Sequence, residues 1–395
     1  MTDEDLIFEV RAWLSANWNP ANTSNPPGAA LLEWRTRVHA QGYAAPSWPT
    51  AWGGLGLSET QSKLVEQQFR AAGAPGSGQD RTNIAANTLL RYGTDAARTE
   101  LLAGFVTGKL VTCLLYSEPG AGSDLAAVRT RADRENDSYV VTGQKVWTSA
   151  AQAADFGLLI ARTDWDAPKH AGLSYFICPM KQSGVEVRPI HQINGESHFN
   201  EVFLDAARLP AAYLLSTEGD GWKVMQTALA YERLIMAEGA TERRKGTDTT
   251  GLDVIALARS YSKLDDPVIR REVAEAIAWR RLNSLNGQRA KAAAEAGESS
   301  PLMSLGKLAM SRVLHNDARV RRLIVGARSL LDGPEFPEAE DINYRSLHAY
   351  MNSIGGGTDQ IQRNIIGERV LGLPRELEVD RSIPFRESLA VKSSA

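Results

Sequence analysis

The sequence predicts a mainly helical protein with a β domain in the middle of the chain. Apolar residues recur at three- and four-residue spacing in the first and last thirds. Between them, short β-rich runs follow one another at roughly ten-residue intervals without a helical pattern. We therefore expect an N-terminal helical domain over residues 1–110, an antiparallel β-barrel domain over 111–215 and a C-terminal four-helix bundle over 216–380. Residues 381–395 read as a frayed tail.

The individual segments support each domain in turn. The first helices are expected in DLIFEVRAWLSANW and GAALLEWRTRVHAQ, and the Pro- and Gly-rich stretch PSWPTAWGGLGLS interrupts them. The expected strands are KLVTCLLYS, SYVVTGQKVWTSA, FGLLIAR, GLSYFICPM, GVEVRPI and NEVFLDAARLP. The expected bundle helices are GWKVMQTALAYERLIMAEGATERR, DPVIRREVAEAIAWRRLNSLNGQRA, SPLMSLGKLAMSRVLHNDARVRRLI and GGTDQIQRNIIGERVL.

Composition excludes several classes of function. The formal net charge is −3 and no basic run is present, which argues against nucleic-acid binding. No apolar stretch approaches the roughly 20 residues of a membrane span. The two cysteines, Cys113 and Cys178, are too few for a disulfide framework or a cysteine metal site. We expect a cytoplasmic protein without a structural metal.

Two motifs lie in the β region. In YSEPGAGSD, the segment Pro119–Gly122 allows backbone amides to converge on a ligand, but its spacing is not GxGxxG, which disfavours a Rossmann site. A tight turn between strands is the simpler alternative. In GQKVWTSAA, a strand ends at Trp147, Thr148 and Ser149; an indole beside two hydroxyl groups can flank a flat heteroaromatic ring, although core packing also explains Trp147.

A third motif, GGTDQIQRNIIGERVLG, opens with glycines that leave room for a ligand or simply cap a helix. In this order and at these distances, the three motifs resemble the acyl-CoA dehydrogenase family of flavoproteins. The resemblance implies FAD bound at a subunit interface, an acyl-CoA substrate and an electron-transfer flavoprotein as electron acceptor. It also implies which residues contact the cofactor: Leu114, Tyr116, Ser117, Gly122, Ser123, Trp147, Thr148, Ser149, Thr358 and Gln360.

One family feature is missing. Many members carry their catalytic glutamate in a Tyr-Glu-Gly-Thr stretch, and the matching residues here are Gly355, Gly356, Gly357 and Thr358. A base must therefore come from elsewhere. The three glycines, with Ser123 and Arg233, are expected to contact the substrate, and they leave room for a bulky, branched or steroid side-chain acyl group.

The helix expected over 219–244 offers a replacement base. At about 100° per residue, Met225, Leu229, Glu232 and Met236 lie within about 60° of one another, so a carboxylate stands on an apolar stripe. Burial there is expected to raise the pKa of Glu232 toward neutral pH, as a general base requires. An ion pair between helices is the alternative. A subset of the family places its base at this position, which implies that Glu232 removes the α-proton while a hydride leaves the β-carbon.

Two further motifs that bind the ADP half of a neighbour's FAD are also replaced, by TDTTGLDVIALARSYSKLDDPVIRRE and VGARSLLDGPEFPEAEDI. The pattern resembles actinobacterial acyl-CoA dehydrogenases that act on steroid side chains as two-plus-two heterotetramers. We therefore expect a second subunit that completes the FAD site. Two alternatives remain: a non-catalytic FAD-binding partner subunit, and an acyl-CoA oxidase that uses oxygen to reoxidise its flavin.

Overall fold

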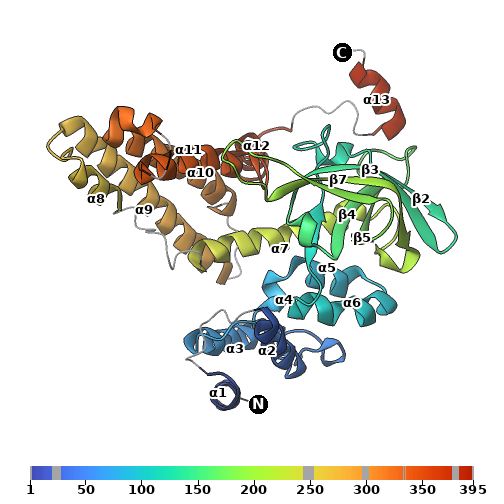
Figure 1. Ribbon diagram of the computed structural model, residues 1–395. Helices are drawn as coiled ribbons and strands as arrows, with labels where there is room; N and C mark the ends of the chain where they lie inside the picture. The colour runs from blue at the N-terminus through green and yellow to red at the C-terminus, as the bar shows by residue number, and fades with distance from the viewer. Residues whose placement is uncertain are drawn as a thin grey trace. The chain divides into compact units, whose positions relative to one another are not determined.

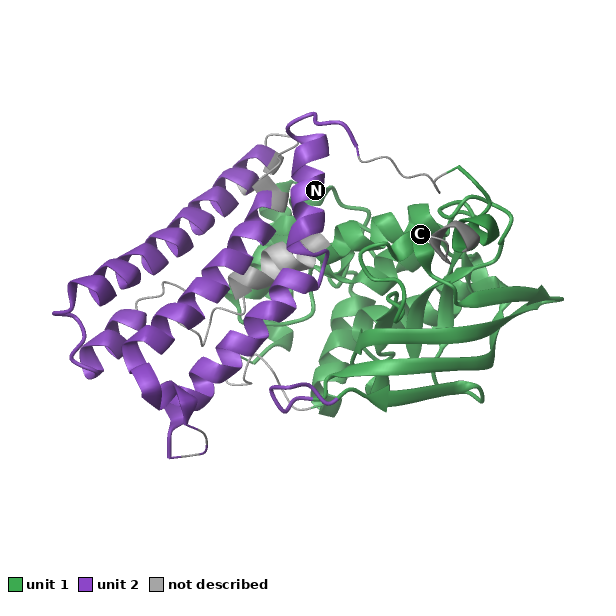
Figure 2. Cartoon of the chain, turned by 90° about the horizontal axis from the view of Figure 1, so that it is seen from above, with its two compact units in different colours: residues 1–190, 197–240, 379–395 green, residues 191–196, 241–378 purple. Residues whose placement is uncertain are grey.

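The structure is a computed structural model that describes residues 2–19, 28–242, 253–295, 302–331, 333, 335–375 and 382–393. It forms two compact units (Figure 2). The first comprises residues 1–190, 197–240 and 379–395, and the second comprises residues 191–196 and 241–378. The first unit holds the N-terminal helices, the sheet, most of helix α7 and the last helix, α13, whereas the second holds helices α8 to α12 (Figure 1).

The N-terminal helices of the first unit are α1 (Asp3–Asn17), α2 (Gly28–Ala40), α3 (Glu59–Ala71), α4 (Gln79–Thr82), α5 (Ile84–Tyr92) and α6 (Asp95–Thr107), with a 3₁₀ turn at Thr50–Trp52. Their starts follow local chemistry, because the side chains of Thr2, Ser58, Asn83 and Thr94 each accept a hydrogen bond from a backbone N–H of the first turn. The two helices and the irregular Pro/Gly stretch expected from the sequence are confirmed.

One sheet forms the middle of the chain, in the order β6-β7-β3-β2-β4-β5-β8, with β1 beside β4. The strands are β1 (Thr112–Leu115), β2 (Arg131–Glu135), β3 (Ser138–Ser149), β4 (Phe156–Arg162), β5 (Leu173–Pro179), β6 (Val185–Pro189), β7 (Phe199–Pro210) and β8 (Leu214–Leu215). The expected antiparallel β domain is confirmed in most pairings. Strands β2 and β8 were not expected, and β1 and β2 pair with β4 in parallel.

The sheet separates two hydrophobic cores. Alternate residues of β4 point to opposite faces, so Leu158 and Ile160 join the core shared with the N-terminal helices, while Leu159 and Ala161 join a core inside the β domain. Helix α7 (Gly221–Glu242) contributes to the first of these cores. The face of β1, β4 and β5 that meets the N-terminal helices is therefore also the face that meets the start of α7.

The second unit contains α8 (Asp253–Ser260), α9 (Pro267–Glu295), α10 (Leu302–Val325), a 3₁₀ segment (Gly326–Leu330), α11 (Pro337–Ile354) and α12 (Asp359–Arg369). Helix α10 packs against the other four α-helices of this unit. The predicted order of helical, β and helical parts is confirmed, and α8 and α11 are helices that the sequence pattern did not predict. Among the described helices, none is both long and apolar enough to cross a membrane.

The expected frayed tail is wrong. Residues Phe385–Ser393 form helix α13, and Phe385 is buried. The guanidinium of the buried Arg162 lies 3.5 Å from the centroid of the Phe385 ring, and Arg386 forms an ion pair with Asp166. A cation–π contact and a buried aromatic ring supply the stabilisation that the short polar sequence alone does not.

Candidate functional site

The glycine loop follows β1 as predicted. The backbone N–H of Val146 donates to the carbonyl of Ser117 at 2.9 Å, and Glu118 and Ala121 close a tight turn by two backbone hydrogen bonds of 3.0 Å. A Cβ added at Gly120 or Gly122 would meet no atom within 4 Å. The chain's own packing therefore does not require glycine here, and the outer surface of the loop stays bare for a close-lying ligand.

A buried ion pair anchors this loop to the sheet. Lys145 is fully buried, and its Nζ donates to Glu118 Oε1 at 2.8 Å, to the Tyr116 carbonyl at 3.1 Å and to the Ile160 carbonyl at 2.8 Å. The Glu118 carboxylate also accepts from the backbone N–H groups of Arg129 and Thr130. Burial alone would raise the pKa of Glu118, but the Lys145 charge and these donors hold that pKa below its usual value.

Trp147, Thr148 and Ser149 end β3, as expected. Core packing does not explain Trp147, because its side chain is 59% exposed. Its φ of 62° is in the left-handed region, at a shift in the register between β3 and β7. A large side chain in this conformation carries strain of roughly 1–3 kcal/mol, a feature concentrated at ligand sites.

Beside Trp147, buried polar atoms lack partners. Thr148 Oγ1 and Asn200 Oδ1 are both buried without a hydrogen-bond partner among the described residues. Buried polar atoms are nearly always satisfied, so these two call for a group outside the chain. An exposed indole, an unsatisfied hydroxyl and a bare glycine loop fit a flat ring with polar edges, such as the isoalloxazine of FAD.

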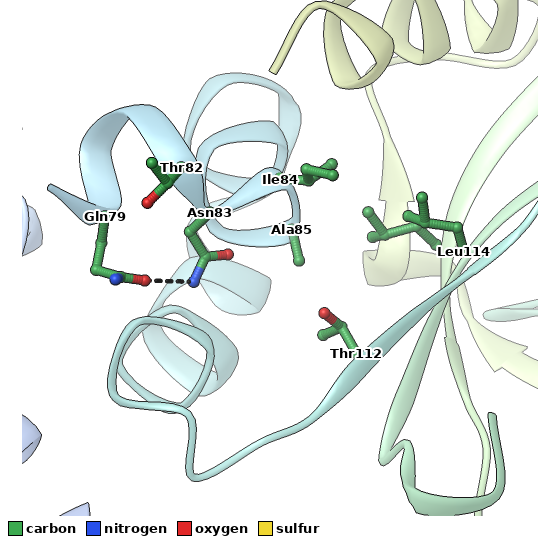
Figure 3. A pocket seen from close by; sticks show the side chains of 8 residues that line it. Gln79, Thr82, Asn83, Ile84, Ala85, Thr112 and Leu114 are labelled. Carbon is green, nitrogen blue, oxygen red and sulfur yellow. Dashed lines mark hydrogen bonds between the residues drawn. The ribbon is translucent and has the colours of Figure 1, made fainter. Parts of the chain in front are cut away.

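A cavity of 340 Å³ opens between the N-terminal helices and the sheet (Figure 3). Helices α4 and α5 line one side, and Leu114 and Thr112 of β1 line the other (Figure 3). Its walls are formed by Gln79, Thr82, Asn83, Ile84, Ala85, Thr112, Leu114 and Leu158. Of these, only Leu114 was predicted as a site residue. No motif marks the α4–α5 residues, because they approach β1 only through the fold.

Glu232 lies on α7 and is half-buried. On the same helix face Met225 is fully buried and Leu229 packs against the core, in line with the predicted apolar stripe. The hydroxyls of Tyr116 and Tyr175 lie 2.5 Å apart. Burial raises the pKa of both tyrosines, and the negative charge of Glu232 raises both further, so the carboxylate acts on the residue that opens the glycine loop.

Other predicted residues of the first unit take surface positions: Gly122, Ser123 and Ser149 are exposed, and Ser117 is half-buried. The side chains of Arg233 and Met236 lie outside the described residues. The glycine loop, Trp147–Ser149 and Glu232 therefore all belong to one compact unit.

The remaining predicted residues belong to the second unit, where they join two helices. Gly355 caps α11, with its N–H donating to the Met351 carbonyl at 2.7 Å. Gly356 and Gly357 have φ of 62° and 85°, which favour glycine. Thr358 caps α12 by accepting from the backbone N–H of Ile361 at 3.2 Å, and Gln360 is exposed. The capping role considered for the glycines is thus present, and it leaves the Gln360 side chain available to a ligand.

Comparisons with known proteins agree with these features. Residues 3–109, 113–206 and 219–371 match the N-terminal, middle and C-terminal domains of acyl-CoA dehydrogenase. The chain is 35% identical to acyl-CoA dehydrogenase IpdE1 of Mycobacterium tuberculosis, over 94% of this chain and 98% of that protein. It is 36% identical to acyl-CoA dehydrogenase FadE34 of the same organism, over 88% of this chain and 47% of that protein.

Two solved structures are also similar. The Tcur3481-Tcur3483 steroid ACAD has a TM-score of 0.71 at 28% identity, with 95% of this chain and 98% of that chain covered. The ChsE4-ChsE5 complex from Mycobacterium tuberculosis has a TM-score of 0.67 at 27% identity, with the same coverage. The chain therefore belongs to the acyl-CoA dehydrogenase family of FAD-dependent oxidoreductases.

Proposed function

We propose that this acyl-CoA dehydrogenase uses Glu232 to remove the α-proton of a bulky, branched or steroid side-chain acyl-CoA, giving the trans-2-enoyl-CoA. The observation that carries the proposal is the place of Glu232. It is a half-buried carboxylate whose charge acts on Tyr116 of the glycine loop, in a chain with glycines where many relatives carry their base.

Different residues of the chain are proposed to bind the cofactor and to remove the proton. The glycine loop, Trp147, Thr148 and Ser149 would hold the isoalloxazine ring, with Thr358 and Gln360 as further contacts. FAD, when bound, accepts the hydride that leaves the β-carbon. Glu232 holds an ionised carboxylate beside the α-carbon and takes its proton, since the thioester carbonyl makes that proton acidic. Electron-transfer flavoprotein is the proposed acceptor of the electrons.

We assign the cavity of α4, α5 and β1 to the acyl group. Its volume of 340 Å³ lies within the usual size of small-molecule sites. The steroid assignment follows the name of one similar structure, the Tcur3481-Tcur3483 steroid ACAD. Ser123, Arg233 and Gly355–Gly357 are the further proposed substrate contacts.

Narrowing this cavity is expected to change substrate preference. Thr112→Leu enlarges a side chain of the wall, so the KM for a steroid side-chain thioester should rise by about tenfold while that for butyryl-CoA stays within about twofold, because overpacking costs roughly 1–3 kcal/mol. The measurement is anaerobic flavin bleaching with straight, branched and steroid-derived thioesters. Bleaching by the short thioesters alone in the unmodified enzyme would refute the bulky substrate, and peroxide release in air would indicate an oxidase.

A partner subunit is the second part of the proposal. Two segments of the chain replace the family motifs that would bind a neighbour's FAD. The first segment contains helix α8, and the second contains the 3₁₀ segment and the start of α11. Residues 247–252 of the first segment lie outside the described part. Unit two also exposes large apolar side chains, a feature of interaction surfaces: Leu330, Tyr344, Tyr350, Met351, Ile354 and Leu371. The name of the similar ChsE4-ChsE5 structure describes a complex of two differently named components.

The partner is tested by expression. Produced alone, the chain is expected to retain well under one FAD per chain, and coproduction with a second acyl-CoA dehydrogenase subunit should restore flavin and activity together. The measurements are flavin absorbance per chain and mass by light scattering. Full flavin occupancy and activity of the chain by itself would contradict the two-plus-two heterotetramer.

A further inference from the structure

Two tyrosines of the first unit, one of them the predicted cofactor contact Tyr116, form a hydroxyl pair that the proposed flavin contacts do not use. Tyr116 directly follows β1, and Tyr175 lies in β5. Their hydroxyl oxygens are 2.5 Å apart and their ring centroids 6.1 Å apart. Tyr175 is completely buried and Tyr116 is half-buried. Placing two hydroxyl groups at a hydrophobic core costs free energy, because burying polar groups is unfavourable, so a function for this pair is expected.

The pair lies on the sheet face that meets α7. Tyr175 shares one core with Met225 and Ala228 of α7, and Tyr116 and Leu229 pack at the edge of that core. Residues three apart on a helix are neighbours on its surface, so Glu232 follows Leu229 on the same face. The charge of Glu232 reaches both phenols, since it raises the pKa of each beyond the effect of burial.

The two hydroxyl groups have one hydrogen-bond donor left over. Each neutral phenol has one proton to donate, and the bond between the two oxygens uses one of the two protons. The described residues contribute no other hydrogen bond to either hydroxyl. The pair therefore retains one hydroxyl proton to donate. Glu232 lies on the α7 face that packs on the same core, and its carboxylate is an acceptor whose charge acts on both phenols.

We propose that, when substrate is bound, the Tyr116–Tyr175 pair donates a hydrogen bond through its remaining hydroxyl group to the Glu232 carboxylate and thereby positions this base at the α-carbon of the substrate. This inference rests on the proposed role of Glu232. The tyrosines keep their protons throughout the reaction, so they are positioning residues. A charge-assisted hydrogen bond fixes the orientation of the carboxylate and holds it ionised.

The test isolates proton removal from hydride transfer. The β-carbon of 3,3-dimethylbutyryl-CoA bears no hydrogen, so this thioester can lose an α-proton but cannot be dehydrogenated. Mass spectrometry of its deuteration in D₂O by the flavin-containing enzyme therefore measures the base alone. Tyr116→Phe and Tyr175→Phe are each expected to slow deuteration by about tenfold, the size of one lost hydrogen bond to a charged group. The Kd for the thioester should stay within about twofold.

Two further variants make the result decisive. Tyr139→Phe is the matched control, since its hydroxyl also bonds a carboxylate, Glu218 Oε1 at 2.5 Å, but in the opposite core; its deuteration rate should be unchanged. Glu232→Gln should abolish deuteration, and retained deuteration there would refute the base itself. If Glu232→Gln is inactive while both tyrosine variants react at the normal rate, the positioning role is overturned. Equal slowing by Tyr139→Phe would also overturn it, since the loss would then be general.

Discussion

Replacing Glu232 by glutamine is expected to leave the yellow FAD in place and to slow its reduction by substrate by about 10²- to 10⁴-fold, the usual contribution of a general base. The amide has nearly the same shape as the carboxylate, so the packing of Met225 and Leu229 beside it should persist. It cannot accept the α-proton at neutral pH. Stopped-flow bleaching of the flavin under anaerobic conditions measures this loss directly.

The control for this variant is Glu186→Gln, which makes the same chemical change on exposed strand β6, where Glu186 pairs with Arg188. Its bleaching rate should equal that of the unmodified enzyme. Binding of the enoyl product should also be unchanged in Glu232→Gln, because the carboxylate is proposed to act on the proton. Normal bleaching in Glu232→Gln would remove this residue from the mechanism and favour a non-catalytic partner subunit.

The sequence predicts the structural positions of residues whose signal is local. The apolar spacing around Glu232 predicted its helix face, because periodicity in a long helix is retained in the fold. GQKVWTSAA likewise predicted the strand end at Trp147, although its left-handed backbone and its exposure could not be read from the motif. A strained residue is where local preference and structure disagree, and such disagreements are expected at functional sites.

Other features depend on contacts between distant segments. Tyr175 reads as an ordinary strand residue, and only the pairing of β1 and β5 with β4 brings it to Tyr116. The cavity residues of α4 and α5 carry no motif for the same reason. Helix α13 was missed because its stability comes from Phe385 against Arg162, more than two hundred residues earlier. Spacing along the chain does not encode these contacts.

Lys145→Met is expected to lower the free energy of unfolding of the first unit by about 3 kcal/mol or more, because it leaves Glu118 buried without its counter-charge. The carbonyls of Tyr116 and Ile160 lose their donor as well. Two backbone N–H groups still bond the Glu118 carboxylate, which places the loss toward the lower end of the range for broken buried pairs. Urea denaturation followed by tryptophan fluorescence measures the effect, and flavin content reports the loosened glycine loop.

The pH dependence and a double variant identify the ion pair as the cause. In the unmodified protein the pKa of Glu118 is lowered, so the pair's stabilisation is present above the unfolded pKa near 4.3 and is lost as pH falls through the folded value. In Lys145→Met, burial then raises the pKa of Glu118, so acid protonates it and the gap between the two proteins should narrow. Lys145→Met with Glu118→Gln should recover part of the loss at neutral pH, since no buried charge remains. If the losses of unfolding free energy from the two substitutions add in the double variant, the two side chains act independently. The ion pair would then not be what holds the glycine loop to the sheet.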